Sequence, residues 1–234
     1  MSTVREDKDR GLNRLVRIRE EHIHLFPQLR ITVKLAAQVL SSSMANALML
    51  KDAAQYSSTA ILCRNMDKWF DCLNGRHLNQ ARDKRKPELG AYFDKNDWRF
   101  HWLENDFLGW LNSWENEIDN QPGLSASEKR SLILSYQTME DLKITTKSFT
   151  ELLPLLLADD GSLFVLPEKL NQDKLELLFG KLRRSLGDLD NPTVYEAMYR
   201  LLTLLLAGSV TATPRNANAI DFDAGHGFQL NRRR

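Results

Sequence analysis

The acidic side chains that lie off the apolar stripes of this sequence are the residues most able to do chemistry. Asp71 and Asn74 lie three residues apart near the end of one helical pattern, and Asp173 and Glu176 lie three residues apart in a later one. Residues at this spacing share a helix face, so each pair could border a common site. Carboxylates there could hold a divalent ion or accept hydrogen bonds from a ligand. A solvated helix surface predicts the same residues, so the spacing alone leaves both interpretations open.

The common nucleotide and metal motifs are absent from the sequence. No stretch fits a phosphate-binding Gly-x4-Gly-Lys-Ser/Thr loop or a Gly-x-Gly-x-x-Gly turn. His22 and His24 would point to different faces of a helix, and His77, His101 and His226 have no partners at metal-ligand spacing. These histidines are therefore interpreted as hydrogen-bonded or solvated.

Composition limits the possible partners. The 234 residues include 32 Lys and Arg against 31 Asp and Glu, a net charge of +1, so any DNA contact must be local. The basic stretch 82–86 is interpreted as a solvated loop in preference to a phosphate-binding patch. Cys63 and Cys72 cannot make a disulfide framework, no apolar run would span a membrane, and the polar N-terminus is not a signal peptide. A nuclear or cytoplasmic location without a membrane partner is expected.

Apolar spacing predicts an almost wholly helical protein. Ser125 and Glu128 have the spacing of a capping box, and Trp110 and Trp114 belong to an aromatic stripe that is interpreted as core and not as a cofactor box. A short extended segment is expected at 162–166, and the tail 208–234 is expected to be disordered. The predicted helices cover residues 35–48, 62–73, 103–118, 125–142, 171–182 and 193–205.

Three stretches, in this order, resemble the P-element-type transposase family, which includes proteins with a THAP zinc finger. The stretches are VKLAAQVLS (33–41), MDKWFDCLN (66–74) and LNQDKLELLFGKLR (170–183), the last followed by Asn191-Pro192-Thr193. The resemblance extends, with gaps, from about Phe26 to about Leu206. It implies a helical GTP-binding insertion domain at 1–155 and the C-terminal segment of an RNase H-like domain at 156–207.

The resemblance also implies roles for individual residues. Glu176 stands at the place of the family's third catalytic carboxylate, which binds Mg²⁺ for phosphoryl transfer. The family's GTP contacts correspond to Val33, Ser41, Asp71, Asn74 and Asp173. Guanine offers two adjacent N–H donors that one carboxylate can accept and adenine cannot reproduce, so Asp71 or Asp173 could read the base. Thr32 stands where relatives can have a basic residue, so one phosphate contact is in doubt.

Parts of the family pattern have no counterpart in the sequence. No strand-like run before Val33 supplies the two earlier catalytic Asp residues, and no Cys/His quartet supplies a zinc finger. The sequence therefore predicts a fragment or degenerate copy of a transposase that binds GTP as a structural and regulatory ligand. Its enzyme activity alone is uncertain, DNA would be a partner only within a full-length transposase, and homo-oligomerisation is left open. The alternative is a ligand-free helical interaction module, and residual nuclease activity with partner chains is disfavoured.

The positions of the carboxylates predict an architecture. If Asp173 touches the nucleotide and Glu176 faces a metal, Asp71 and Asp173 should border one cleft despite their distance in sequence. The side of this helix formed by Leu175, Leu178, Phe179 and Leu182 should then be buried.

Overall fold

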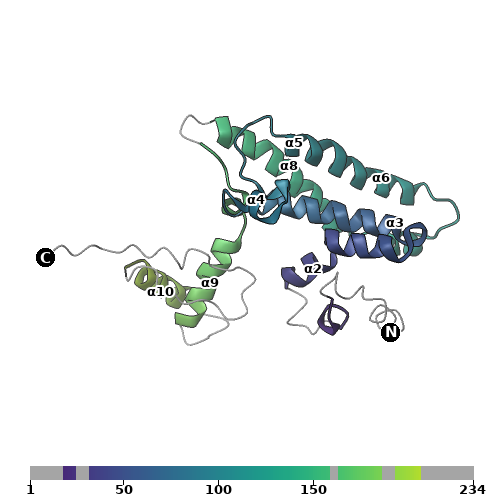
Figure 1. Ribbon diagram of the computed structural model, residues 1–234. Helices are drawn as coiled ribbons and strands as arrows, with labels where there is room; N and C mark the ends of the chain where they lie inside the picture. The colour runs from purple at the N-terminus through teal and green to yellow at the C-terminus, as the bar shows by residue number, and fades with distance from the viewer. Residues whose placement is uncertain (1–17, 25–31, 159–162, 186–192, 207–234) are drawn as a thin grey trace. The chain divides into compact units, whose positions relative to one another are not determined.

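The structure is a computed structural model that describes residues 18–24, 32–158, 163–185 and 193–206 (Figure 1). The chain divides into two compact units, Met1–Ile31 with Leu35–Lys169, and Thr32–Lys34 with Leu170–Arg234. Each unit is described by itself. The tail 208–234, predicted to be disordered, lies outside the described residues.

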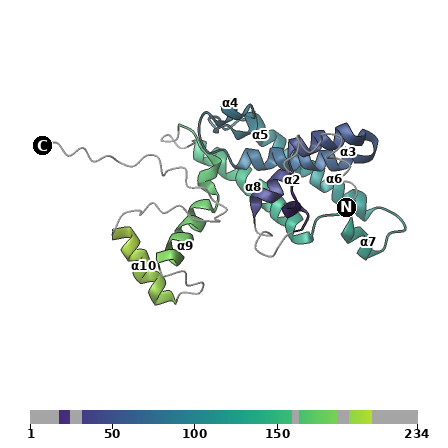
Figure 2. The ribbon, with the colours of Figure 1, turned by 60° about the horizontal axis from the view of Figure 1, so that its bottom comes forward.

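Helices make up almost all of the regular structure, as the sequence predicts. Helices α3, α6 and α8 run side by side, with η5 in contact with α3 and α8 (Figures 1 and 2). No described helix combines the length and apolar character that crossing a membrane requires. Up to residue 170 the elements are η2 (Glu20–His22), α2 (Val33–Val39), α3 (Ser42–Leu73), α4 (Gln80–Lys84), η4 (Pro87–Leu89), α5 (Trp98–His101), η5 (Trp102–Phe107), α6 (Leu108–Asp119), α7 (Ala126–Ser131), α8 (Tyr136–Ala158) and η6 (Pro167–Leu170).

The helix predicted over 35–48 is interrupted. Helix α2 ends at Val39, and Ser41 caps α3 in an extended conformation, its Oγ accepting the N–H of Met44 at 3.2 Å. The prediction of one continuous helix is wrong here because a serine cap can end one helix and begin another without disturbing the apolar spacing.

Helix α3 is a hairpin of two arms that turns at Asp52, whose φ of −161° and ψ of 101° are not helical. The arms contact each other through Ser42 Oγ, 2.5 Å from Asp67 Oδ2, and through Arg64 Nη2, 3.1 Å from Asn46 Oδ1. Small buried side chains let the arms approach closely, namely Ala45, Ala60 and Cys63. The second arm contains the predicted helix 62–73, and the hairpin brings residues near the start of α3 beside that arm.

The aromatic stripe forms the continuous run of α5, η5 and α6, of which η5 is a π-helical segment. Phe107 is fully buried, and its ring lies 5.8 Å from Trp69, 5.6 Å from Trp102 and 5.9 Å from Trp110, measured between centroids. Helix α6 ends at Asp119, before Pro122, as predicted. The interpretation of Trp110 as a core residue is confirmed, since it packs half-buried against this cluster.

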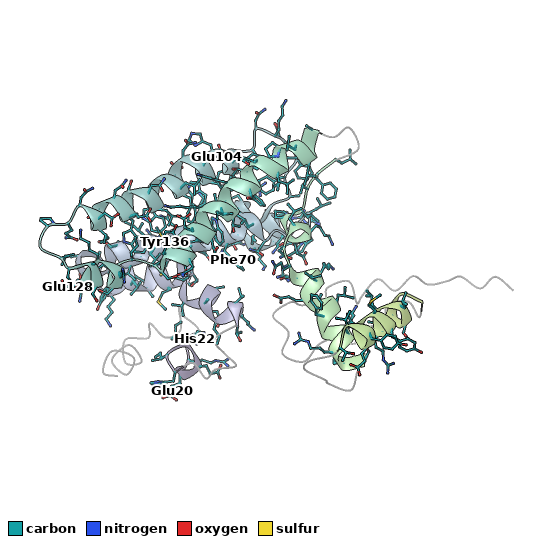
Figure 3. All side chains as sticks on the ribbon, turned by 180° about the vertical axis from the view of Figure 1, so that it is seen from behind. Glu20, His22, Phe70, Glu104, Glu128 and Tyr136 are labelled. Atoms are coloured by element: carbon teal, nitrogen blue, oxygen red, sulfur yellow. The ribbon has the colours of Figure 1, made fainter. Side chains whose placement is uncertain are left out.

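The helix predicted to start at Ser125 is shorter than expected. The capping box is confirmed, because Ser125 Oγ accepts the N–H of Glu128 and the Glu128 carboxylate accepts the N–H of Ser125; Glu128 is labelled in Figure 3. Helix α7 then ends at Ser131, and Ser135 begins a new helix by accepting the N–H of Thr138 at 3.2 Å. Continuity through residue 142 is wrong for the same reason as at Ser41, a second local serine cap.

The short extended segment is confirmed where it is described. Val165 forms an isolated antiparallel bridge with Tyr92, with N···O distances of 2.9 and 2.8 Å. The bridge ties the chain after α8 to the loop before α5.

The second unit contains α9 (Asp173–Ser185) and α10 (Val194–Leu206), which contact each other and match the predicted helices. The predicted buried side of α9 is only partly correct. Leu182 is buried, but Leu175 and Phe179 are each 50% exposed, and Leu177 is buried instead. A helix with one described helical neighbour buries only a narrow stripe, so a side of i, i+3, i+4 and i+7 spacing is too wide to be covered completely.

Gly75, directly after the C-cap of α3, offers a test of the packing there. A Cβ atom at this position would lie 2.8 Å from the carbonyl oxygen of Leu89, which is backbone. We expect Gly75→Ala to lower the free energy of unfolding by about 1–3 kcal/mol, measured by urea denaturation. Gly109→Ala is the matched control, because a Cβ there would meet no atom within 4 Å. The control should be neutral or stabilising by up to about 1 kcal/mol, and equal losses in both variants would contradict the packing argument.

Candidate functional site

A half-buried lysine joins two acids of α3. Lys86 Nζ lies 2.5 Å from Asp71 Oδ2 and 2.9 Å from Asp67 Oδ2. The Asp67 and Asp71 side chains are 14% and 13% exposed, and that of Lys86 is 37% exposed. We call these three residues the carboxylate–lysine cluster. It is more enclosed than an ordinary surface ion pair, so solvent screens it less.

Local structure brings the three side chains together. Asp67 and Asp71 are four residues apart and therefore share one face of α3. Helix α4 ends at Lys84, and its C-cap, Arg85, has the left-handed conformation with φ 54°. The N–H of Lys86 then donates to Ala81 O at 2.9 Å. This turn fixes the backbone of Lys86, and η4, which follows it, contacts α3.

The interpretation of stretch 82–86 as a solvated loop is wrong in part, because residues 82–84 belong to α4 and the side chains are solvated at one end of the stretch only. The Arg82 side chain is 79% exposed, whereas Lys86 is held by two carboxylates. Sequence reasoning missed Lys86 because its partners lie 15 and 19 positions away. The available signal was a pair of acids at i and i+4 on a helix, followed by a lysine directly before a proline.

The charge state of Asp71 depends on its neighbours. Burial raises the pKa of the Asp71 carboxyl, the hydrogen bond and the charge of Lys86 lower it, and the charges of Asp67 and Glu88 raise it, with an upward net shift. Burial lowers the pKa of Lys86, but the hydrogen bonds to Asp71 and Asp67 together with the charges of these acids outweigh burial and raise it overall. Lys86 is thus the group that opposes neutralisation of Asp71.

Three of the predicted GTP contacts lie in the first unit. Asp71 belongs to the cluster, and Asn74 is the C-cap of α3, where its Nδ2 donates to Phe70 O at 2.7 Å. Ser41 is the N-cap of α3, and the next residue, Ser42, donates to Asp67 of the cluster. The hairpin therefore places the cap of the first arm next to the segment that holds Asp71.

The other predicted site residues lie in the second unit. Val33 is the first residue of α2 and is 49% exposed. Asp173 is the first residue of α9, and its N–H donates to Asn171 Oδ1 at 3.0 Å. Glu176 is exposed one turn later in α9. Because Asp71 and Asp173 belong to different units, a shared cleft between them stays a prediction.

No metal site surrounds Glu176 within the described part of the chain. A search of those residues finds no group of three or more His, Cys, Asp or Glu side chains placed to hold an ion. One exposed carboxylate does not satisfy the six oxygen ligands that Mg²⁺ prefers. The assignments of Glu176 as a catalytic residue and as an Mg²⁺ ligand stay predictions.

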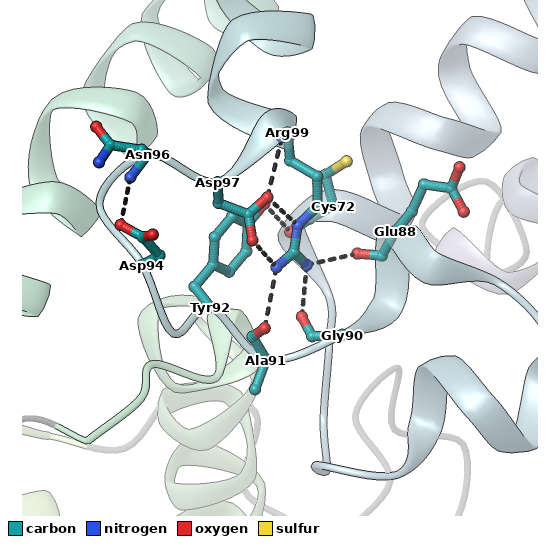
Figure 4. A network of polar contacts seen from close by, with 9 residues as sticks. All are labelled: Cys72, Glu88, Gly90, Ala91, Tyr92, Asp94, Asn96, Asp97 and Arg99. Carbon is teal, nitrogen blue, oxygen red and sulfur yellow. Dashed lines mark hydrogen bonds and ion pairs between the residues drawn. The ribbon is translucent and has the colours of Figure 1, made fainter.

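A second polar network stabilises the loop that follows Lys86 (Figure 4). The buried guanidinium of Arg99 donates from Nε and Nη2 to the two carboxylate oxygens of Asp97, at 2.9 and 2.7 Å. It also lies 3.4 Å from the ring centroid of Tyr92, whose hydroxyl donates to Cys72 O in α3. The remaining donors reach three backbone carbonyls, those of Glu88, Gly90 and Ala91. Each N–H donor of the Arg99 guanidinium therefore has an acceptor, as expected of a buried arginine that stabilises the fold.

Two family models match the segments that contain the predicted site residues. A family model described as "TNP-like, GTP-binding insertion domain" matches residues 2–86, which contain the carboxylate–lysine cluster. A second model, described as "TNP-like, RNase H C-terminal domain", matches residues 168–198, which contain Asp173 and Glu176. Both matched segments support a P-element-type transposase family member, in agreement with the resemblance noted in the sequence.

The chain is similar to a curated protein and to a solved structure. It is 26% identical over 214 residues to "Transposable element P transposase" of Drosophila melanogaster, covering 89% of this chain and 26% of that protein. Its fold is similar to a chain of the "Drosophila P element transposase strand transfer complex", with a TM-score of 0.51, 23% identity and coverage of 84% of this chain and 42% of that one. The chain thus spans about a quarter of the curated relative and less than half of the solved chain.

Proposed function

We propose that this transposase-family chain binds GTP as a structural and regulatory ligand, and that Asp71 reads the guanine base. The observation that carries the proposal is the half-buried Asp71 carboxylate, which lies inside the segment matched by the GTP-binding insertion model. Lys86 contacts Asp71 through Oδ2, so this ion pair does not engage Oδ1. A carboxylate in this setting is oriented before a ligand arrives, which lowers the cost of binding.

The chemistry of the base favours guanine. Guanine presents N1–H and an exocyclic amine side by side, and both can donate to one carboxylate. Adenine presents an acceptor at N1, whose lone pair would face the negatively charged carboxylate without a hydrogen bond. A site that uses buried polar groups in this way rejects a mismatched ligand strongly, because its own groups would be left unpaired.

We propose that the other residues assigned by the family resemblance make further contacts with GTP. Ser41 and Asn74 are the helix caps on either side of α3, and they support the proposal by their position in the same matched segment as Asp71. Val33 and Asp173 are proposed contacts on the family resemblance alone. The sequence contains no Walker A loop to support hydrolysis, which favours GTP as a ligand over GTP as a fuel. DNA is proposed as a partner only within a full-length transposase, and no metal-dependent step is proposed for Glu176.

Isothermal titration of the folded chain with GTP and ATP, with and without Mg²⁺, tests the proposal. We expect GTP to bind and ATP to bind far more weakly. Asp71→Asn should weaken GTP at least about 100-fold, because the amide places a donor opposite the guanine N–H groups. Asp106→Asn is the control, since Asp106 is an exposed acid of η5 that belongs neither to the cluster nor to the proposed contacts, and the GTP affinity of this variant should be unchanged. If protein shown to be folded does not bind GTP at millimolar concentration, the proposal is wrong.

A ligand-free helical interaction module is the second candidate. The observation that favours it is the exposed apolar side of α10, formed by Val194, Tyr195, Met198, Tyr199 and Leu202. A ligand that binds only the native state must raise the melting temperature, whereas a module without nucleotide gives no such rise. A GTP-dependent rise that is lost in Asp71→Ala, Asn74→Ala and Asp173→Ala would therefore decide for the first candidate.

A further inference from the structure

We infer that Lys86 is a positioning residue that determines nucleotide specificity, because it holds Asp71 as the charged, doubly accepting carboxylate that guanine requires. The inference rests on the proposed function and adds to it a residue that touches the acid and not the base. Its physical basis is the geometry of the carboxylate–lysine cluster.

Lys86 is restrained at both ends of its side chain. Its backbone N–H is fixed by the hydrogen bond to Ala81 O after the left-handed turn at Arg85. Its ammonium group is 2.5 Å from Asp71 Oδ2 and 2.9 Å from Asp67 Oδ2. A lysine side chain is flexible in solution, so two anchors at the ammonium group are needed to place the charge at one point.

Asp67 provides the anchor that remains when a ligand arrives. Ser42, on the other arm of α3, holds Asp67 through a hydroxyl hydrogen bond of 2.5 Å to the same oxygen that Lys86 contacts. An ammonium group has three donors, so Lys86 can keep its contact with Asp67 while Asp71 turns its accepting oxygens toward a base. Receiving guanine therefore requires only a turn of the Asp71 side chain, while Lys86 stays anchored to Asp67.

The charges around Asp71 make this lysine decisive. Besides Lys86, the charged groups that act on Asp71 are Asp67 from the same helix and Glu88 from η4, and both favour the protonated acid. Without Lys86, Asp71 would be enclosed beside two like charges and would take up a proton at higher pH. A protonated carboxyl keeps one donor and cannot accept both guanine N–H groups, so GTP binding would become dependent on pH.

The decisive variants are Lys86→Met, which removes the charge at similar length, and Lys86→Arg, which keeps it. GTP affinity is measured by titration calorimetry from about pH 5 to about pH 8, relative to the wild type at each pH. In Lys86→Met the affinity should fall about tenfold for each pH unit below the new pKa of Asp71 and recover as pH rises through it. Lys86→Arg should restore most of the affinity. Lys84→Met is the control, since Lys84 is exposed in α4, and it should follow the wild type.

A second measurement uses no nucleotide. The carboxyl carbon of Asp71 is titrated by NMR in the ligand-free protein, where Lys86→Met should raise the pKa of Asp71 above that of the wild type and of Lys86→Arg. Asp67→Asn serves as the structural variant, because it removes one anchor and leaves the charge beside Asp71. It should alter stability without creating a new pH dependence of GTP affinity.

The outcomes separate the two proposals. If the folded wild type does not bind GTP, both the proposed function and this inference fail. If the wild type binds GTP but Lys86→Met keeps wild-type affinity across the pH range, or the pKa of Asp71 is unchanged, only the inference is overturned. Failure of Lys86→Arg to restore binding would also overturn it, because that result assigns Lys86 a purely steric role.

Discussion

Arg99→Met is expected to lower the free energy of unfolding by about 3–5 kcal/mol. The Arg99 side chain is 3% exposed and Asp97 is 15% exposed, so the substitution leaves a carboxylate enclosed without its counter-ion. It also removes the donors to three backbone carbonyls, and a buried carbonyl that loses its partner costs free energy. The loop between η4 and α5 should lose its conformation first.

Urea denaturation followed by far-UV circular dichroism measures this loss. Arg82→Met is the matched control, because Arg82 is 79% exposed and pairs with Asp83 only at 3.6 Å. The control should change stability by no more than about 0.5 kcal/mol. Arg99→Lys should recover little of the stability lost in Arg99→Met, since an ammonium group cannot reproduce the planar arrangement of donors that Asp97 and the carbonyls require. A loss below about 1 kcal/mol for Arg99→Met would mean that the network does not stabilise this loop.

Helical periodicity predicted most of the elements because their buried stripes are local in sequence. The aromatic stripe of η5 and α6 was found in this way, whereas α5 was not predicted. The capping box at Ser125 was found from the spacing of Ser125 and Glu128. The breaks at Ser41 and Ser135 were missed, since apolar residues continue at helical spacing across both caps. A serine cap favours a break between two helices, whereas a continuous apolar stripe favours one unbroken helix. Tertiary packing decides between these two outcomes.

The contacts of the candidate site depend on long-range folding. The hairpin of α3 at Asp52 brings Ser42 to Asp67, and the turn at Arg85 brings Lys86 to the same acid. Helical periodicity predicts neither pairing, because the partners are separated by 25 and 19 positions. Asp71 itself was identified through the family motif and not through its environment. The sequence thus indicated which acid to consider, and the structure added the groups that control its charge.

Exposure on α9 shows a different limit of sequence reasoning. Leu175 and Phe179 have the spacing of a buried side, yet each is 50% exposed in the second unit, while Leu177 is buried. Periodicity identifies where apolar residues gather on a helix, but the width of the neighbouring surface decides how many are covered.

Phe107→Ala is the second large effect we expect, with a loss of about 3–5 kcal/mol in the free energy of unfolding. Phe107 is fully buried and its ring contacts those of Trp69, Trp102 and Trp110. Truncation would remove these contacts and leave a cavity among large rings that cannot easily collapse. Trp69 lies two residues before Asp71 on α3 and donates its indole N–H to Thr146 Oγ1 at 2.8 Å.

Equilibrium denaturation by urea, followed by far-UV circular dichroism, avoids the change in tryptophan emission that this substitution itself would cause. Phe107→Leu should lose about 1–1.5 kcal/mol, because it keeps most of the buried volume. Phe93→Ala is the exposed control, since Phe93 is 64% exposed, and it should lose no more than about 0.5 kcal/mol. If Phe107→Ala and Phe93→Ala cost the same, the aromatic cluster is not the centre that fixes α3. If instead the Phe107→Ala loss is large and GTP binding weakens with it, the helix that holds Asp71 depends on this cluster for its position.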